Sequence, residues 1–296
     1  MSTPTQNSWE EIPSASTATP ATAWFANALR SDQPRLNVIL FILTCVSTFL
    51  TGGGAEGKWR NGLWYCAGII AILFAHEMGH YLMCVRYRIR ATLPFFIPFP
   101  FSPFGTLGAV IRMDARMPNR KTLFDIGVAG PLAGLVFTLP AIYFGLLMST
   151  PTASVNVQGE TILLGESLLF KGLSYLALGA EQDVMLHPLA YAGWAGLFVT
   201  ALNLLPIGQL DGGHILYALL GDRGRKVYPV NMAMFALLCI VVYAGWVLLV
   251  MMLLWIGYRH PPTQDDDEPL DLKRQALAYF TFLVFIVSFT PTPFQM

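Results

Sequence analysis

The sequence predicts an all-α polytopic membrane protein with about six transmembrane helices and a re-entrant or interfacial β-like loop after the second. Of the 296 residues, 54% are hydrophobic and only 12% are charged, whereas soluble proteins are about 25% charged. Six apolar segments approach the roughly 20 residues that cross a bilayer. The net charge of zero gives no indication of a nucleic-acid partner.

The chain begins with a polar stretch before the first apolar segment. Residues 1–34 are rich in Ser, Thr, Ala and Pro, and they lack the basic start and apolar core of a signal peptide. We therefore expect a disordered cytoplasmic tail, followed by one membrane-embedded domain at residues 35–296. The fourth apolar segment is interrupted at Pro206 and Gly208, and the sixth is short. The six segments are 36–53, 62–84, 124–148, 189–220, 228–257 and 275–290.

The distribution of basic residues predicts the orientation. With six spans, twelve Lys and Arg residues fall on one side and six on the other. Cytoplasmic loops carry the excess of positive charge, so both termini are expected in the cytoplasm. The connection at 149–188 is expected on the opposite side, as a cap over the site. We expect a multi-pass integral protein of a prokaryotic cytoplasmic membrane, surrounded by lipid.

Residues 91–113 follow the second apolar segment and read ATLPFFIPFPFSPFGTLGAVIRM. Four prolines exclude a regular helix, and five phenylalanines make the stretch too apolar for a solvated loop. Irregular backbone survives at membrane depth only where it is buried in protein or lines a wet cavity. We predict a re-entrant or interfacial loop that is extended at 107–113. A plain interfacial hairpin without a catalytic role is the alternative.

The second apolar segment contains His76-Glu77-Met78-Gly79-His80. Two histidines four residues apart lie on one face of a helix, so both imidazoles can bind one Zn²⁺. Glu77 stands where a general base for the attacking water is needed. Ionisable groups in lipid are costly, which indicates a functional site.

A catalytic zinc site needs a third protein ligand, and Asp211 in the fourth segment is the candidate. Asp211 is an ionisable residue among apolar neighbours, and two glycines follow it. The second and fourth spans run in the same direction. His76 and His80 lie about 9–15 Å from the cytoplasmic end of their span, and Asp211 lies about 15 Å from the end of its own. The three side chains can therefore meet at one depth.

HEMGH in one span and NLLPIGQLDGG in a later one resemble the site-2 protease family of intramembrane zinc metalloproteases. The resemblance covers roughly 62–220 and implies a compact form, because the PDZ domain often inserted between these motifs has no room. It implies that one zinc ion per chain is bound by His76, His80 and Asp211. It further implies that Glu77 is catalytic, that Asn203 holds substrate or the oxyanion, and that transmembrane proteins are cleaved in regulated intramembrane proteolysis.

Other functions fit the same residues. A metal or proton transporter that uses the intramembrane charges is the main alternative, and a binding protein with a degenerate site is the third. The presence of Glu77 in the motif argues against a binding protein with a degenerate site. For Asn203, an interhelical hydrogen bond is the structural alternative.

Several nearby residues are given no chemistry. His214 is expected to support the site or to pack, and His260 to lie at the interface. The acidic run at 265–268 is expected to be a solvated connection. Gly127, Gly130 and Gly134 are expected to form a smooth helix face for close packing.

Overall fold

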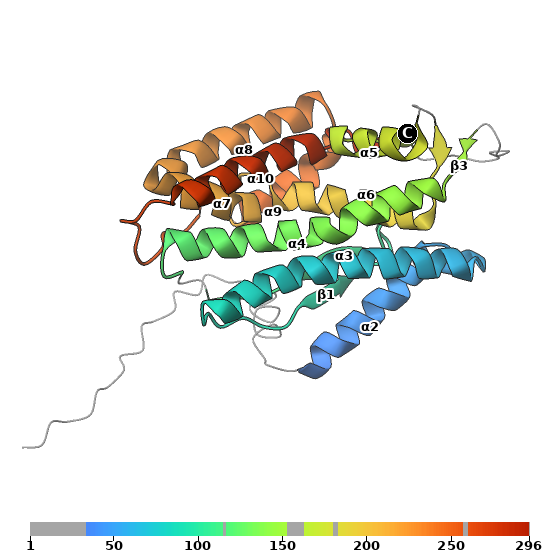
Figure 1. Ribbon diagram of the computed structural model, residues 1–296, viewed down its shortest axis with the longest axis horizontal. Coiled ribbons are helices and arrows are strands. Elements are labelled where there is room, and N and C mark those ends of the chain that lie inside the picture. Colours follow the sequence, from blue (N-terminus) through green and yellow to red (C-terminus); the bar gives the residue numbers. More distant parts are fainter. Residues whose placement is uncertain (1–33, 115–116, 153–162, 180–182, 257–259, 296) are drawn as a thin grey trace, which may run out of the picture. The chain divides into compact units, whose positions relative to one another are not determined.

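The computed structural model describes residues 34–114, 117–152, 163–179, 183–256 and 260–295 (Figure 1). This part of the chain is mostly helical, and its long helices lie side by side. The helical character predicted from the sequence is therefore confirmed. The predicted disordered tail lies outside the described residues, apart from Pro34.

The elements follow one another along the chain with three small two-stranded antiparallel sheets among the helices. The strands are β1 (Phe95–Pro98) with β2 (Thr106–Val110), β3 (Thr150–Pro151) with β5 (Val184–Met185), and β4 (Leu163–Leu164) with β6 (Phe294–Gln295). The α-helices are α2 (Pro34–Thr51), α3 (Trp59–Arg86), α4 (Arg120–Leu147), α5 (Leu168–Leu178), α6 (Pro188–Asn203), α7 (Asp211–Leu220), α8 (Gly224–Val241), α9 (Val247–Ile256) and α10 (Leu272–Ser288). Short 3₁₀ turns are η1 (Gly54–Glu56), η3 (Gly221–Arg223) and η4 (Ala244–Trp246).

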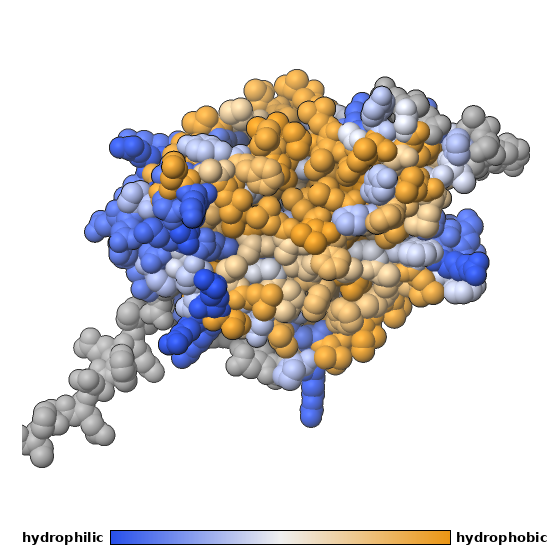
Figure 2. All heavy atoms as spheres, in the orientation of Figure 1, coloured by the Kyte–Doolittle hydropathy of each residue, from blue (hydrophilic) through white to orange (hydrophobic). Residues whose placement is uncertain are grey.

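Among the described residues, three helices are long and apolar enough to cross a membrane: α2, α3 and α4. The fourth predicted span is divided into α6, with 16 residues, and α7, with 10 residues. Helix α10 has 17 residues. Six spans are therefore not shown. On the face drawn in Figure 2, hydrophobic side chains occupy the middle and hydrophilic ones gather at both ends, as expected of a protein that lies in a bilayer.

The fifth predicted span, 228–257, does not form one helix. Helix α8 ends at Val241, and after η4 the chain continues as α9. Beyond α9, the chain lies beside the start of α4, where Asp265 pairs with Asn119. Helix α10 then runs to the opposite end, where β6 pairs with β4.

The pairing of β6 with β4 corrects the predicted position of the C-terminus. Strand β4 belongs to the 149–188 connection, which was predicted to be extracytoplasmic. Strand β6 therefore lies at that end of the helices and not at the end where Arg120 begins α4. The extra reversal at η4 is the reason, because it changes the number of times the chain passes between the two ends.

A β-hairpin formed by β1 and β2 connects α3 to α4, which confirms the β-like character predicted for 91–113. Whether this stretch re-enters the membrane or lies at its interface stays a prediction. Phe95 pairs with Val110 and Phe96 with Ala109, and Ala91 pairs with Met113 beyond the strands. Helix α2 packs mainly against β1, whereas α3 lies beside β2. The hairpin thus lies between the first helix and the helix that carries the HEMGH motif.

Close packing of α4 against its neighbours depends on glycine. A Cβ on Gly79 of α3 would lie 2.4 Å from the Ala129 carbonyl oxygen of α4. A Cβ on Gly145 of α4 would lie 2.2 Å from the Ala190 nitrogen of α6. Such distances are far below van der Waals contact, so the helix backbones can approach one another only because Gly79 and Gly145 have no Cβ atom.

The reversal at η4 gives a testable topology. Reporter fusions within 155–180 and after Met296 are expected to report the same side of the membrane, because β4 pairs with β6. A fusion after Arg120 is expected to report the other side. Enzymatic or fluorescent reporters with side-specific activity measure this in intact cells. A C-terminal reporter that shared the side of the Arg120 fusion would contradict the β4–β6 pairing.

Candidate metal centre

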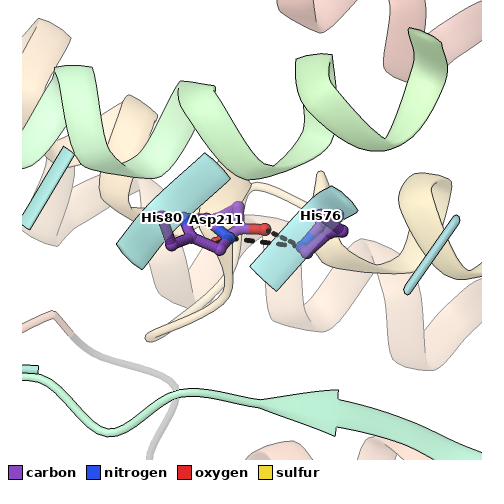
Figure 3. A group of neighbouring side chains, drawn as sticks. All are labelled: His76, His80 and Asp211. Carbon is purple, nitrogen blue, oxygen red and sulfur yellow. Dashed lines mark hydrogen bonds and ion pairs between the residues drawn. The ribbon is translucent and has the colours of Figure 1, made fainter. Parts of the chain in front are cut away.

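Two histidines of α3 and one aspartate of α7 converge in the interior (Figure 3). The Nε2 atoms of His76 and His80 are 3.2 Å apart. The Asp211 carboxylate lies across them, with Oδ2 3.2 Å from His76 Nε2 and Oδ1 3.3 Å from His80 Nε2. Both histidines are buried. The structure thus brings together the three residues that the sequence analysis proposed as ligands.

The spacing of these donor atoms fits a tetrahedral metal ion. Two ligands bound to zinc at about 2.0–2.1 Å with tetrahedral angles lie about 3.3 Å apart. The two imidazole nitrogens are 3.2 Å apart, and each lies 3.2–3.3 Å from a different oxygen of the Asp211 carboxylate. With one ligand atom taken from each residue, the three atoms all lie within 4.8 Å of one another. Two imidazole nitrogens and one carboxylate also form a donor set that catalytic zinc uses. The residues therefore fit a zinc ion in both chemistry and size.

The break between α6 and α7 places Asp211 beside the two histidines. Helix α6 ends at Asn203, and the chain turns at Gly208, which has a φ of +59°. A Cβ on Gly212 would lie 2.0 Å from the Leu204 carbonyl oxygen, and one on Gly213 would lie 2.3 Å from the Gly208 carbonyl oxygen. The two glycines that follow Asp211 therefore let the loop fold back against the first turn of α7.

Backbone and side-chain contacts orient the two imidazoles. His80 Nδ1 lies 2.8 Å from the Ile126 carbonyl oxygen of α4. Because a carbonyl only accepts, Nδ1 carries the proton in this bond and Nε2 presents its lone pair to the centre. The amide nitrogen of Asn203 lies 3.2 Å from His76 Nε2. Asn203 is therefore next to the three converging groups.

Glu77 is buried beside the centre but does not belong to the converging set. The backbone of Ile111, the residue after β2, lies beside the Glu77 carboxylate. Glu77 therefore lies between the three donor groups and the hairpin. In this position the carboxylate can exchange a proton with a molecule that lies at the centre.

The glycines of α4 form the wall of the centre, a role that the sequence analysis did not assign. A Cβ on Gly130 would lie 2.0 Å from His80 Nε2, and one on Gly134 would lie 3.4 Å from His76 Nδ1. These glycines leave room for the imidazoles. Their spacing predicts a smooth helix face, but no local signal indicates that this face packs against the two histidines.

His214 belongs to a second cluster that leads away from the centre. Its Nδ1 lies 2.6 Å from His260 Nε2, and Tyr217 stacks on the His260 ring. The Tyr217 hydroxyl donates to Asp266 at 2.5 Å. The predicted supporting role of His214 fits this arrangement. The acidic run at 265–268 is mostly exposed, as expected of a solvated connection, and only Asp266 is half-buried, where it accepts the hydrogen bond from Tyr217.

Gly130 provides a test of the donor geometry. Gly130→Ala is expected to abolish metal binding at this centre, because the new methyl group would occupy the space of His80 Nε2. Gly172→Ala is the matched control, since a Cβ there meets nothing within 4 Å. Elemental analysis of purified, folded protein measures the metal per chain. Equal metal content in the two variants would show that Gly130 does not border the site.

Comparisons with known proteins identify the family of this chain. The model of Peptidase family M50 matches residues 64–245. The chain is 35% identical over 231 residues to the probable zinc metalloprotease EGY1, chloroplastic, of Oryza sativa subsp. japonica, a match that covers 73% of this chain and 38% of the relative. It is 32% identical over 237 residues to the protein of the same name in Arabidopsis thaliana, a match that covers 76% of this chain and 42% of the relative. It is 29% identical over 232 residues to the probable zinc metalloprotease EGY2, chloroplastic, of Arabidopsis thaliana, a match that covers 75% of this chain and 40% of the relative.

The chain spans about two fifths of the length of these relatives. Their names place them in chloroplasts, so the similarity gives no support to a prokaryotic membrane. Between the two motifs, the described residues form helices and short strands, and no PDZ domain is evident among them. The family match covers more than half of the sequence and contains both HEMGH and NLLPIGQLDGG. The chain therefore belongs to Peptidase family M50, the site-2 protease family.

Proposed function

We propose that this chain is an intramembrane zinc endopeptidase that hydrolyses peptide bonds of transmembrane substrates. One observation carries the proposal: two imidazoles and a carboxylate converge at 3.2–3.3 Å beside a buried glutamate that is not part of the set. Three of the described helices, among them α3 with both histidines, are long and apolar enough to cross a membrane. The relatives named as probable zinc metalloproteases support the same function.

His76, His80 and Asp211 would hold one zinc ion. Zinc supplies Lewis-acid chemistry, which polarises a carbonyl group and makes water a nucleophile at neutral pH. Glu77 acts as the general base: its carboxylate takes a proton from the attacking water and returns it to the leaving amine nitrogen. The products are a carboxylate and an amine, so the reaction consumes one water and needs no other reactant.

Asn203 is proposed to stabilise the developing oxyanion. Its amide nitrogen lies 3.2 Å from His76 Nε2, so an N–H group is already at the centre before substrate binds. Preorganised donors of this kind stabilise negative charge without reorganisation during the reaction. The structural alternative for Asn203, an interhelical hydrogen bond, uses the same side-chain amide as this proposed catalytic role.

A substrate helix must unwind before its peptide bonds become accessible, and the hairpin offers a place for the extended segment. Helix α2 covers β1, whereas β2 lies on the side of α3. The contact between Ile111 and Glu77 places the end of β2 beside the general base. We propose that the unwound substrate adds to β2 as a further strand, because strand addition fixes extended peptides through main-chain hydrogen bonds.

Asp211 provides the test of the ligand set. Asp211→Ala is expected to lower zinc well below one ion per chain, because a three-ligand site loses its only carboxylate. Asp267→Ala is the control, since Asp267 is exposed and far from the converging groups in the sequence. Zinc analysis after dialysis compares the two. Full occupancy in Asp211→Ala would remove this residue from the ligand set.

Glu77 separates the protease from a transporter. Glu77→Gln keeps the size of the side chain but cannot take up the proton, so zinc should stay bound while cleavage is lost. Activity is measured in vesicles on a transmembrane substrate that carries a helix-breaking residue in its span. Glu56→Gln, an exposed position, is expected to cleave normally.

A transporter would give a different pattern in the same vesicles. It would move metal in both the native chain and Glu77→Gln, and it would cleave nothing. Native-level proteolysis by Glu77→Gln would refute the assigned role of this residue as the base.

A further inference from the structure

Helix α2 buries polar side chains and exposes apolar ones. The buried residues are Asn37, Thr44, Ser47 and Thr48. The exposed face carries large apolar side chains, namely Val38, Ile39, Ile42, Leu43, Val46 and Leu50. An apolar outer face suits contact with lipid. Polar groups on the inner face of a membrane helix must find partners in the protein.

Two of the four buried polar side chains are satisfied within the helix itself. The Thr44 hydroxyl donates to the Leu40 carbonyl oxygen at 2.8 Å, and the Thr48 hydroxyl donates to the Thr44 carbonyl oxygen at 2.8 Å. Such bonds to the preceding turn are common for threonine in helices. Neither of these two bonds connects α2 to another element of the structure.

The other two donate to the β1–β2 hairpin. Asn37 Nδ2 donates to the carbonyl oxygens of Leu93 and Pro94, at 2.9 and 3.0 Å, just before β1. Ser47 Oγ donates to the carbonyl oxygen of Gly105, at 2.6 Å, just before β2. One helix therefore holds the hairpin at its base and at its turn.

The spacing of the two donors matches the hairpin. Asn37 and Ser47 are ten residues apart, which is about 15 Å along a helix. A five-residue strand such as β2 is about 17 Å long. The helix thus spans nearly the whole hairpin and fixes it along its length.

The turn of the hairpin lies in direct contact with α2. Gly105 has a φ of +70°, and a Cβ there would lie 2.6 Å from Thr51 Oγ1. The neighbouring carbonyl oxygens are also held, because Tyr65 donates to Phe104 at 2.9 Å and Tyr191 donates to Pro103 at 2.8 Å. These donors bind the turn rather than β2, so β2 is fixed in position without being covered by them.

We infer that α2 sets the position of the substrate-binding strand, with Asn37 and Ser47 as positioning residues. The inference rests on the proposed function, in which β2 receives the unwound substrate. A strand that pairs with β2 inherits the position of β2, and a shift of one residue moves every side chain to the other face. Loss of the two anchors would let the hairpin shift relative to Glu77, and the scissile bond would shift with it.

The test compares donors that reach the hairpin with donors that do not. In the full chain, Ser47→Ala is expected to lower kcat/KM for a transmembrane substrate about threefold, the usual effect of one hydrogen bond between membrane segments. The double variant Asn37→Leu with Ser47→Ala is expected to lower it about tenfold. Thr44→Val and Thr48→Val are matched controls from the same buried face, and they should cleave normally. Ser47→Thr should restore activity, because it keeps the hydroxyl group.

Zinc content and cross-linking distinguish positioning from a general loss of fold. All variants should keep one zinc ion per chain. Substrate binding is measured separately, in a Glu77→Gln chain whose four native cysteines are replaced. A cysteine at Leu107, an exposed position on β2, is cross-linked to a cysteine in the substrate. The yield should fall in the hairpin variants and stay unchanged in the threonine variants.

The outcomes distinguish the positioning role of α2 from the proposed protease function. Native-like cleavage and cross-linking in the Asn37→Leu, Ser47→Ala chain would overturn the positioning role and leave the protease intact. Loss of zinc in that chain would also overturn it, because the anchors would then support the metal centre. If the native chain does not cleave the substrate, and the Leu107 cysteine chain without the hairpin substitutions does not cross-link to it, the proposed function fails, and the inference fails with it.

Discussion

The structure depends on the need to hold two imidazoles and a carboxylate at one point within an apolar interior. An ionised carboxylate is costly in such a place unless it is paired. Asp211 meets this condition by lying 3.2–3.3 Å from both histidine nitrogens. The break before α7 and the glycines of α4 both serve this arrangement. The break brings the carboxylate to the histidines, and Gly130 leaves the space that His80 Nε2 occupies.

A second constraint follows from the first, because the irregular backbone around the centre must find hydrogen-bond partners away from water. Side chains from neighbouring helices provide them. Arg120 donates to the carbonyl oxygens of Ala218 and Leu219, each at 2.9 Å, and so completes the C-terminal end of α7. Asn231 of α8 donates to the Pro206 carbonyl oxygen in the break, at 2.9 Å. The helix that carries the carboxylate is thus held in the break before its first residue and at its last turn.

The sequence predicted the parts of the site that follow from local periodicity. His76 and His80 are one helical turn apart, so their common face needs no tertiary information. Asp211 is identified from its ionisable character among apolar neighbours, and the structure places its carboxylate beside both histidines, as the similar depth of the three residues predicts. The contacts of Gly130 and Asn37 could not be predicted, because each depends on which helices become neighbours. No local pattern specifies that pairing.

The error at 228–257 has a different cause. An apolar run of thirty residues is long enough for one tilted helix, and hydropathy measures length without showing a reversal. Gly245 is the only glycine between α8 and α9, and the run contains one proline, at Pro229, within α8. The turn at η4 depends instead on tertiary contacts. Trp246 stacks on Phe198 of α6 and donates to the Pro291 carbonyl oxygen at 2.8 Å.

The positions of the proposed metal ligands and the proposed base on α3 explain why the hairpin would matter to the proposed chemistry. Consecutive residues of a helix are rotated by about 100°, so Glu77 cannot point in the same direction as His76. The histidines face α4 and α7, where Ile126 and Asp211 lie. Glu77 faces Ile111 at the end of β2. Helix α3 therefore presents the two histidines to α4 and α7, and Glu77 to the hairpin. The distance between the proposed base and a substrate on β2 would depend on the position of the hairpin, which α2 holds at its base and its turn and which Tyr65 and Tyr191 also hold at the turn.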